Sequence, residues 1–355
     1  MKPHCSTYWR MRTLLALAIV LLLTLTASTV FAFEALPSKA PEPKDNPMTP
    51  AKVELGKQLF FDPRLSVDGT VSCNSCHNVM AGGTDNRAVS VGVSGQKGGR
   101  SAPTVWNAAF LTTQFWDGRA ATLEEQAKGP ILNPIEMGMP HKDVAVDRIK
   151  AMPGYVTQFE QVFGKKNPIT YDNIAKAIAT YERTLITPNS PFDLYVKGDK
   201  KALSAKALEG MKLVTEVGCT SCHSGANFAG PTNLKMGEGF FQKFPIFPGS
   251  EYDKKYDLIS DLGRYEVTKN NDDKHVWRVP TWRNVAVTAP YFHNGTVATL
   301  EEAVRVMAKT QLNKKLSNDE VGNIVAFLNS LTGEFPKQTM PRLPDTTNTS
   351  LTAKN

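Results

Sequence analysis

Apolar and polar residues recur with helical spacing over much of the chain. Residues 52–60 and 204–215 place Ala, Leu and Val three or four positions apart with Lys between them, which predicts an amphipathic helix in each stretch. Alternation of the kind that strands show is weak throughout. The pattern therefore predicts a mainly α fold.

The most apolar stretch, residues 13–32, lies near the N-terminus and follows Arg10 and Arg12. Its strongly apolar part, residues 14–25, is shorter than the roughly 20 residues that a membrane-spanning helix needs. A basic start, a short apolar region and small residues before a cleavage point after Ala32 favour a signal peptide over a retained anchor. We therefore expect the segment that ends at Ala32 to be removed on export.

Composition restricts the class of protein. The chain has 355 residues, of which 41% are hydrophobic and 21% charged, so it can bury a core and is long enough for two domains. Its net charge is +7, but three positive charges precede the apolar N-terminal stretch and the remainder carries only +4. A bias this small does not indicate nucleic-acid binding.

Four cysteines remain after export, in two clusters: Cys73-Asn-Ser-Cys76-His77 and Cys219-Thr-Ser-Cys222-His223. Two thiols three residues apart can each bond one vinyl group of a haem, and the adjacent His places an imidazole at the iron. A four-thiolate zinc site would not explain a His after each second Cys, and a redox dithiol usually accompanies a βαβ pattern that is not found nearby. The sequence predicts two covalent haem c groups with His77 and His223 as proximal ligands.

The two halves of the chain repeat each other. Residues 103–107 resemble 280–284 and residues 118–125 resemble 295–302, each pair 177 positions apart, whereas the haem motifs are 146 apart. The second half therefore carries a 31-residue insertion after its haem motif. A duplicated haem-binding unit is the simplest interpretation.

The repeated segments 118–125 and 295–302 each contain the pattern of a capping box, Thr122 to Glu125 and Thr299 to Glu302. This pattern predicts a helix that begins just after each threonine. On the second of these helices Met307 shares a face with Ala303, so its thioether could be a sixth haem ligand. A core methionine is the commoner use of Met, and the sequence pattern alone leaves both open.

The two halves differ at positions where haem ligands and catalytic residues are expected. Pro130 stands at the position equivalent to Met307, so the first helix should end early and offer no ligand. In the first half Gln126 replaces an alanine, Trp116 replaces His293, and Glu136 follows in the next loop. Loss of one iron ligand and gain of a carboxylate suit a reactive haem beside an electron-storing one.

These motifs, together with residues 115–119 and 289–293, resemble the bacterial diheme cytochrome c peroxidases from about Leu55 to Leu331. The resemblance implies two class-I cytochrome-c-like haem domains in tandem, a periplasmic homodimer and a calcium ion near the domain interface. It also implies reduction of hydrogen peroxide to water with two electrons from a small c-type cytochrome or cupredoxin. The predicted division is a signal peptide over 1–32, a peroxidatic domain over 33–190, an electron-transfer domain over 191–335 and a flexible tail over 336–355.

The resemblance also implies roles for individual residues. His77 becomes the proximal ligand of the low-potential peroxidatic haem, and His223 and Met307 the axial pair of the high-potential haem, in keeping with the effect of His/Met ligation. Glu136 becomes the acid–base group and Gln126 the residue that orients peroxide. Without the resemblance Glu136 is not distinguished from Glu124 or Glu125, and a solvated carboxylate is the ordinary use of Glu. Trp116, which could equally be a core residue, is expected between the haems.

Two positions depart from the family pattern. The family usually has a histidine in the loop before residue 103 that caps the resting peroxidatic iron, but residues 78–102 contain none; Val93, or Ser94 under a one-residue shift, occupies that position. We therefore expect the peroxidatic haem to be open in the oxidised enzyme. Ser101 stands where an asparagine usually contributes to the calcium site, and the backbone carbonyls of Thr288 and Pro290 are the other expected ligands.

Three other functions are weighed against peroxide reduction. The related diheme enzyme that oxidises a partner's tryptophans to build a quinone cofactor has Tyr where this chain has Met307. A plain diheme electron carrier would not need Glu136, Gln126 or an open haem. A haem-based sensor would need an output domain, which the sequence lacks.

Overall fold

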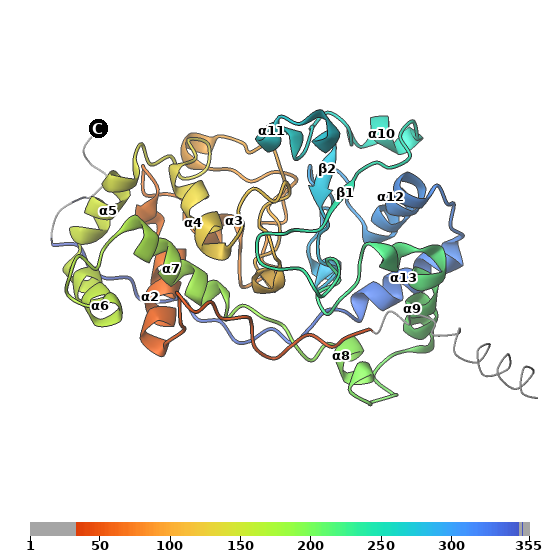
Figure 1. The fold of residues 1–355 in the computed structure, drawn as a ribbon, viewed down its shortest axis with the longest axis horizontal. Helices are drawn as coiled ribbons and strands as arrows, with labels where there is room; N and C mark the ends of the chain where they lie inside the picture. The colour runs from red at the N-terminus through yellow and green to blue at the C-terminus, as the bar shows by residue number, and fades with distance from the viewer. Residues whose placement is uncertain (1–32, 348–349, 351–355) are drawn as a thin grey trace, which may run out of the picture. The chain divides into compact units, whose positions relative to one another are not determined.

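The computed structural model describes residues 33–347 and residue 350, so the predicted signal peptide lies outside the described residues. The described chain is mainly helical, with two short strands (Figure 1). The helices are α2 (Pro50–Phe61), α3 (Cys73–Cys76), α4 (Leu123–Leu132), α5 (Lys142–Lys150), α6 (Pro153–Phe163), α7 (Tyr171–Glu182), α8 (Pro191–Val196), α9 (Ala205–Val217), α10 (Glu251–Lys255), α11 (Tyr265–Thr268), α12 (Leu300–Leu312) and α13 (Asn318–Asn329); the strands are β1 (Phe241–Lys243) and β2 (Val276–Arg278).

Helices α4 and α12 begin where predicted. The Thr122 hydroxyl accepts from the Glu125 amide and the Thr299 hydroxyl from the Glu302 amide, which caps each helix. The reciprocal half of the predicted capping box is absent, because Glu125 pairs with a lysine one turn along α4 and Glu302 accepts from Tyr256 and from Lys255. The α4 helix ends two residues after Pro130, whereas α12 continues through Met307.

Each half contains one close helix crossing. Helix α2 packs on α7, and α9 packs on α13 (Figure 1). At the crossings Gly56 lies against the backbone carbonyl of Ala177, and Gly210 against that of Asn323. A Cβ at either glycine would lie within 2 Å of that oxygen, so only glycine permits these helices to approach so closely.

The loops between the repeats have the same conformation in both halves. Asn107 and Asn284 are both left-handed, and each precedes a 3₁₀ turn. Phe115 and Phe292 both have positive φ angles, of 68° and 71°. Both pairs share the offset of the sequence repeats, so the duplication that the sequence predicts is present in the backbone.

The segment between the second haem motif and residue 280, which includes the 31-residue insertion, contains β1, α10, α11 and β2. The strands pair antiparallel, with Phe241 opposite Arg278 and Gln242 opposite Trp277. This segment also reaches the first half, because Arg100 donates to both carboxylate oxygens of Asp261. The segment therefore forms part of the junction between the repeats.

The C-terminal segment lies along the first half as far as it is described. Phe335 packs edge-on against Trp106 at 5.0 Å, Tyr181 donates to Gln338, and Arg64 donates to the Pro344 carbonyl. The flexibility predicted for residues 336–355 thus remains a prediction, and over residues 336–347 the chain has specific contacts. From Glu34 onward the chain forms one compact unit, and the domain boundary at residue 190 also stays a prediction. None of the helices among the described residues is long and apolar enough to cross a membrane.

Candidate active site and haem-binding cavity

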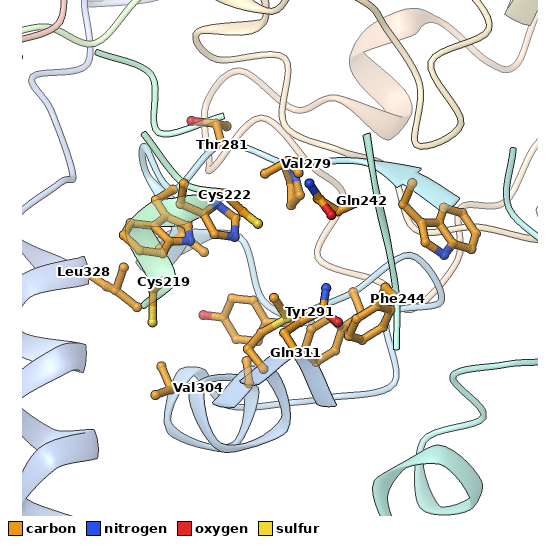
Figure 2. A pocket seen from close by; sticks show the side chains of 18 of the residues that line it. Cys219, Cys222, Gln242, Phe244, Val279, Thr281, Tyr291, Val304, Gln311 and Leu328 are labelled. Atoms are coloured by element: carbon orange, nitrogen blue, oxygen red, sulfur yellow. The ribbon is translucent and has the colours of Figure 1, made fainter. Parts of the chain in front are cut away.

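A largely apolar cavity of ≈ 430 Å³ lies in the second half and extends to the junction with the first. Its wall includes both cysteines of the second motif, His223 and Met307, together with Trp116 from the first half. Figure 2 shows Cys222 across the open space from Gln311 of α12, and Cys219 on the side where Val304 of α12 lies. The size and apolar lining are those of a cavity that holds an organic cofactor.

His223 is buried and oriented as a metal ligand requires. Its Nδ1 lies 3.1 Å from the Phe228 carbonyl, and its ring stacks on Trp282 at 4.4 Å. A hydrogen bond at Nδ1 leaves the Nε2 lone pair for iron. Burial lowers the pKa of His223 to about 4, so the imidazole is neutral at physiological pH.

His77 has the same arrangement in the first half. It follows α3, which carries both cysteines of the first motif, and its Nδ1 lies 2.9 Å from the Pro103 carbonyl. Burial lowers the pKa of His77 as well. The repeated geometry fits a proximal ligand at each motif.

The four cysteines are unpaired thiols. Burial raises the pKa of Cys219 to about 11 and raises the pKa of the other three, so none is a thiolate near neutral pH. Within the part of the chain that the structure describes, no three His, Cys, Asp or Glu side chains come together as a metal site. The geometry therefore fits thioether attachment of haem better than a zinc or redox-dithiol site.

Glu136 lies in the turn after α4. Its Oε1 accepts from the Asn133 side chain at 2.6 Å, and burial raises its pKa even though Arg119 and that hydrogen bond oppose the rise. Glu136 also contributes to the raised pKa of Cys73 and Cys76, which places its charge close to the first haem motif.

The structure distinguishes Glu136 from the two neighbouring glutamates. Glu124 forms an ion pair with buried Arg183 at 2.8 Å, which helps to lower the pKa of Glu124. Glu125 is exposed and pairs with Lys128. Of the three, Glu136 has the partly buried carboxyl with a raised pKa that suits acid–base chemistry.

Val93 is close to this carboxyl in the fold. It is buried, and its amide donates to the Glu136 backbone carbonyl at 2.9 Å. Ser94 follows in a left-handed conformation with φ 56°. Val93, one of the two candidates for the position of the family's capping histidine, is therefore a buried apolar residue whose backbone is anchored to that of Glu136.

Of the remaining predicted residues, Trp116 and the three candidate calcium ligands line the cavity, and Gln126 lies on α4. Trp116 donates from Nε1 to the Ser101 carbonyl at 2.8 Å and is half-buried in the wall of the cavity. Ser101, Thr288 and Pro290 line the same cavity. Gln126 is half-buried on α4.

Comparisons with known proteins identify the family of this chain. The sequence profile of the family "Di-haem cytochrome c peroxidase" matches residues 50–201. A cytochrome c551 peroxidase of Pseudomonas aeruginosa is 46% identical, covering 90% of this chain and 89% of the relative, and one of Nitrosomonas europaea is 45% identical, covering 93% and 95%. The chain belongs to the di-haem cytochrome c peroxidase family.

A solved structure supports the same assignment of fold. A MauG-like protein associated with microbial copper homeostasis matches with a TM-score of 0.72 and 30% identity, over 84% of this chain and 95% of that one. The predicted family and activity are thereby confirmed: the protein is a peroxidase that uses two haems, hydrogen peroxide and a cytochrome electron donor.

Sequence reasoning missed a group of polar residues at the junction of the peroxidase. Asp117 is buried between Arg100 at 2.6 Å and Arg119 at 2.9 Å, and Arg100 also pairs with Asp261 of the second half. Arg278 is buried beside them and donates from Nε to the Phe115 carbonyl at 3.0 Å. These contacts join segments far apart in sequence, and the motifs themselves gave no signal for them.

Proposed function

We propose that the two haems are bound covalently, one through Cys73 and Cys76 and the other through Cys219 and Cys222. His77 would hold the iron of the peroxidatic haem, and His223 and Met307 would together hold the iron of the electron-transfer haem. The neutral imidazoles, with their Nδ1 atoms facing backbone carbonyls, support this assignment. So does the presence of His223 and Met307 in the wall of one cavity. When bound, the haems supply the site where peroxide is held and the two electrons that reduce it.

The peroxidatic side uses Glu136 as its acid–base group. The carboxylate takes a proton from one peroxide oxygen and returns it to the other, so that the leaving oxygen departs as water rather than hydroxide. The single observation that carries this role is the partly buried carboxyl with a raised pKa beside the first haem motif. A pKa nearer to neutral allows the same group to accept and donate the proton. Gln126 orients peroxide by hydrogen bonding.

Trp116 helps electrons to pass from the haem of one half to the haem of the other. It comes from the first half, lines the cavity of the second, and is fixed by its hydrogen bond to Ser101. An aromatic ring in this position shortens the gap that an electron must cross between the haems.

The peroxidatic haem is open in the oxidised enzyme. Neither the Val93 side chain nor the neutral hydroxyl of Ser94 is a good ligand for ferric iron, and the Val93 amide is hydrogen-bonded to the Glu136 backbone carbonyl. No reductive step is then needed to remove a protein ligand before peroxide binds. In this respect the enzyme departs from the pattern that its family implies.

The domain organisation, calcium ion, oligomeric state, location and electron donor that we propose are those that the family resemblance implies. The two halves are class-I cytochrome-c-like domains, over 33–190 and 191–335, an organisation that the equivalent α2–α7 and α9–α13 crossings support. A calcium ion binds near their junction through Thr288 and Pro290 carbonyls, with Ser101 beside them; all three line one cavity. The mature enzyme is a periplasmic homodimer that receives electrons from a small c-type cytochrome or cupredoxin.

The variant Glu136→Gln tests the proposed mechanism. It keeps the size and the contact with Asn133 but removes the proton-carrying group, so we expect kcat for peroxide reduction to fall by about 10²- to 10⁴-fold. Glu125→Gln, on the exposed face of α4, is the matched control and should change kcat less than about twofold. Haem content and spectra should be unchanged in both. Near-normal turnover by Glu136→Gln would exclude Glu136 as the acid–base group.

A further inference from the structure

Arg278, at the end of β2, is a buried cation with unusual surroundings. Its side chain donates to two backbone carbonyls, those of Phe115 at 3.0 Å and Val279 at 3.1 Å. Among the described residues it has no carboxylate within ion-pair distance. The other buried arginine of this region, Arg283, pairs with fully buried Asp193 at 2.8 Å. Arg278 thus carries a buried positive charge that the protein does not neutralise.

The nearest acidic group is already occupied. Asp117 attracts Arg278 electrostatically, but its carboxylate binds both Arg100 and Arg119. Burial lowers the pKa of Arg278 to about 10, which still leaves the guanidinium charged at neutral pH. Taking an unpaired charge out of water is costly, so a buried arginine without an acid indicates a missing anionic partner.

Two further groups in the same wall also lack partners. Trp277 Nε1 and His293 Nε2 are buried and make no hydrogen bond to the described residues, and their rings stack at 4.2 Å. Both residues line the cavity, as does Arg278. Trp can only donate, and a neutral His can donate from Nε2, so together with Arg278 these residues can offer two N–H donors and a positive charge.

We infer that Arg278, Trp277 and His293 form a carboxylate-binding site for the propionate side chains of the haem attached at Cys219 and Cys222. An arginine fork and ring N–H groups match the geometry and charge of a carboxylate. The inference rests on the proposed function, since it needs a haem in this cavity.

This combination of residues is not repeated in the first half, where Arg100, already paired with Asp117 and Asp261, takes the position of Trp277. By the offset of the repeats, Arg278 is equivalent to neutral Ser101 of the first half, and His293 is equivalent to Trp116. A haem gains negative charge when it is reduced, so a fixed cation at its carboxylates stabilises the reduced form. Arg278 therefore raises the reduction potential of the electron-transfer haem relative to the peroxidatic one.

Potentiometric titration of the holoenzyme, followed by the absorption of each haem, tests this. Arg278→Gln should lower the reduction equilibrium constant of the second haem about tenfold, which is ~59 mV for one electron. Trp277→Phe keeps a ring in place but removes one donor, and should lower the constant about threefold. The matched control is Arg264→Gln. Arg264 also donates to a backbone carbonyl of the 115–118 turn, that of Asp117, but is not among the residues that line the cavity.

An unchanged constant in a haem-replete Arg278→Gln enzyme, or an equal shift in Arg264→Gln, would overturn the inference. If Arg278→Gln does not incorporate haem, the test rests on Trp277→Phe. An unchanged reduction equilibrium constant of the second haem in that variant would likewise overturn the inference. Failure of the proposed function would look different: the wild-type protein itself would contain fewer than two haems or lack the His/Met spectrum.

Discussion

Single carboxyl groups show how burial sets chemistry in this peroxidase. Glu182 ends α7, is 5% exposed, and its Oε2 has no hydrogen-bond partner among the described residues. Burial raises its pKa to about 8, although Arg183 opposes the rise. Since the same group in an unfolded chain titrates near 4.5, the folded protein binds an extra proton between these values.

Stability should therefore depend on pH through Glu182. Its contribution is fully present below pH 4.5 and is lost as pH rises to about 8, where the folded state must bury a carboxylate. We expect Glu182→Gln to gain stability relative to wild type across this range, as measured by urea unfolding at several pH values. Glu209→Gln, on the exposed face of α9, is the control. Parallel pH profiles for wild type and Glu182→Gln would contradict this account.

The residue scale is also where sequence reasoning was least complete. The spacing of Cys and His identified both haem motifs without a structure, because covalent attachment requires that local pattern. Glu136 could be selected only through the family resemblance, since its burial and its contact with Asn133 depend on the turn after α4. Arg278 was missed, because an arginine in a sequence does not show whether the fold provides it with an acid.

Helix pairs form the structural unit of each half. The crossings of α2 with α7 and of α9 with α13 both depend on a glycine against a backbone carbonyl. Of these four helices, α2 and α9 were predicted from their periodicity, whereas α7 and α13 were not singled out in the sequence. The crossings were not predicted, because a glycine in a helix sequence gives no sign of what will lie against it.

Alanine substitutions should distinguish packing from helix propensity. Gly56→Ala and Gly210→Ala should each destabilise the holoenzyme by about 1–3 kcal/mol or more, because the new methyl would collide with a carbonyl oxygen. Gly322→Ala, on α13 with open space around it, should instead stabilise by about 0.4–1 kcal/mol. Chemical unfolding of the three variants measures this, and equal effects at all three glycines would show that the crossings are not close-packed as described.

The whole molecule combines a duplicated scaffold with an unsymmetrical junction. The constant offset between the sequence repeats predicted equivalent loops, and the backbone has them. The 31-residue insertion was recognised by length alone, but the contact of Asp261, in the segment that includes it, with Arg100 of the first half could not be foreseen. Such long-range ion pairs depend on the complete fold rather than on local pattern.

In the proposed function, the identity of the residue at position 93 decides whether the peroxidatic haem is open in the oxidised enzyme. Val93→His restores the histidine at the position where the family usually has one. We expect this variant to be inactive or to show a lag when added fully oxidised, and to regain activity after one-electron reduction, as measured by peroxide-dependent oxidation of a reduced c-type cytochrome. Val93→Ala, which adds no ligand, should behave as wild type. Full activity of oxidised Val93→His would show that this position cannot reach the iron.

The most direct test of an always-open peroxidatic haem uses the wild-type enzyme. Steady-state oxidation of a reduced c-type cytochrome by hydrogen peroxide is compared for enzyme added fully oxidised and enzyme reduced by one electron beforehand, with turnover followed from the first seconds. Equal initial rates are predicted, because Val93 provides no ligand that reduction would have to remove. A lag or no turnover in the oxidised sample alone would contradict the open haem.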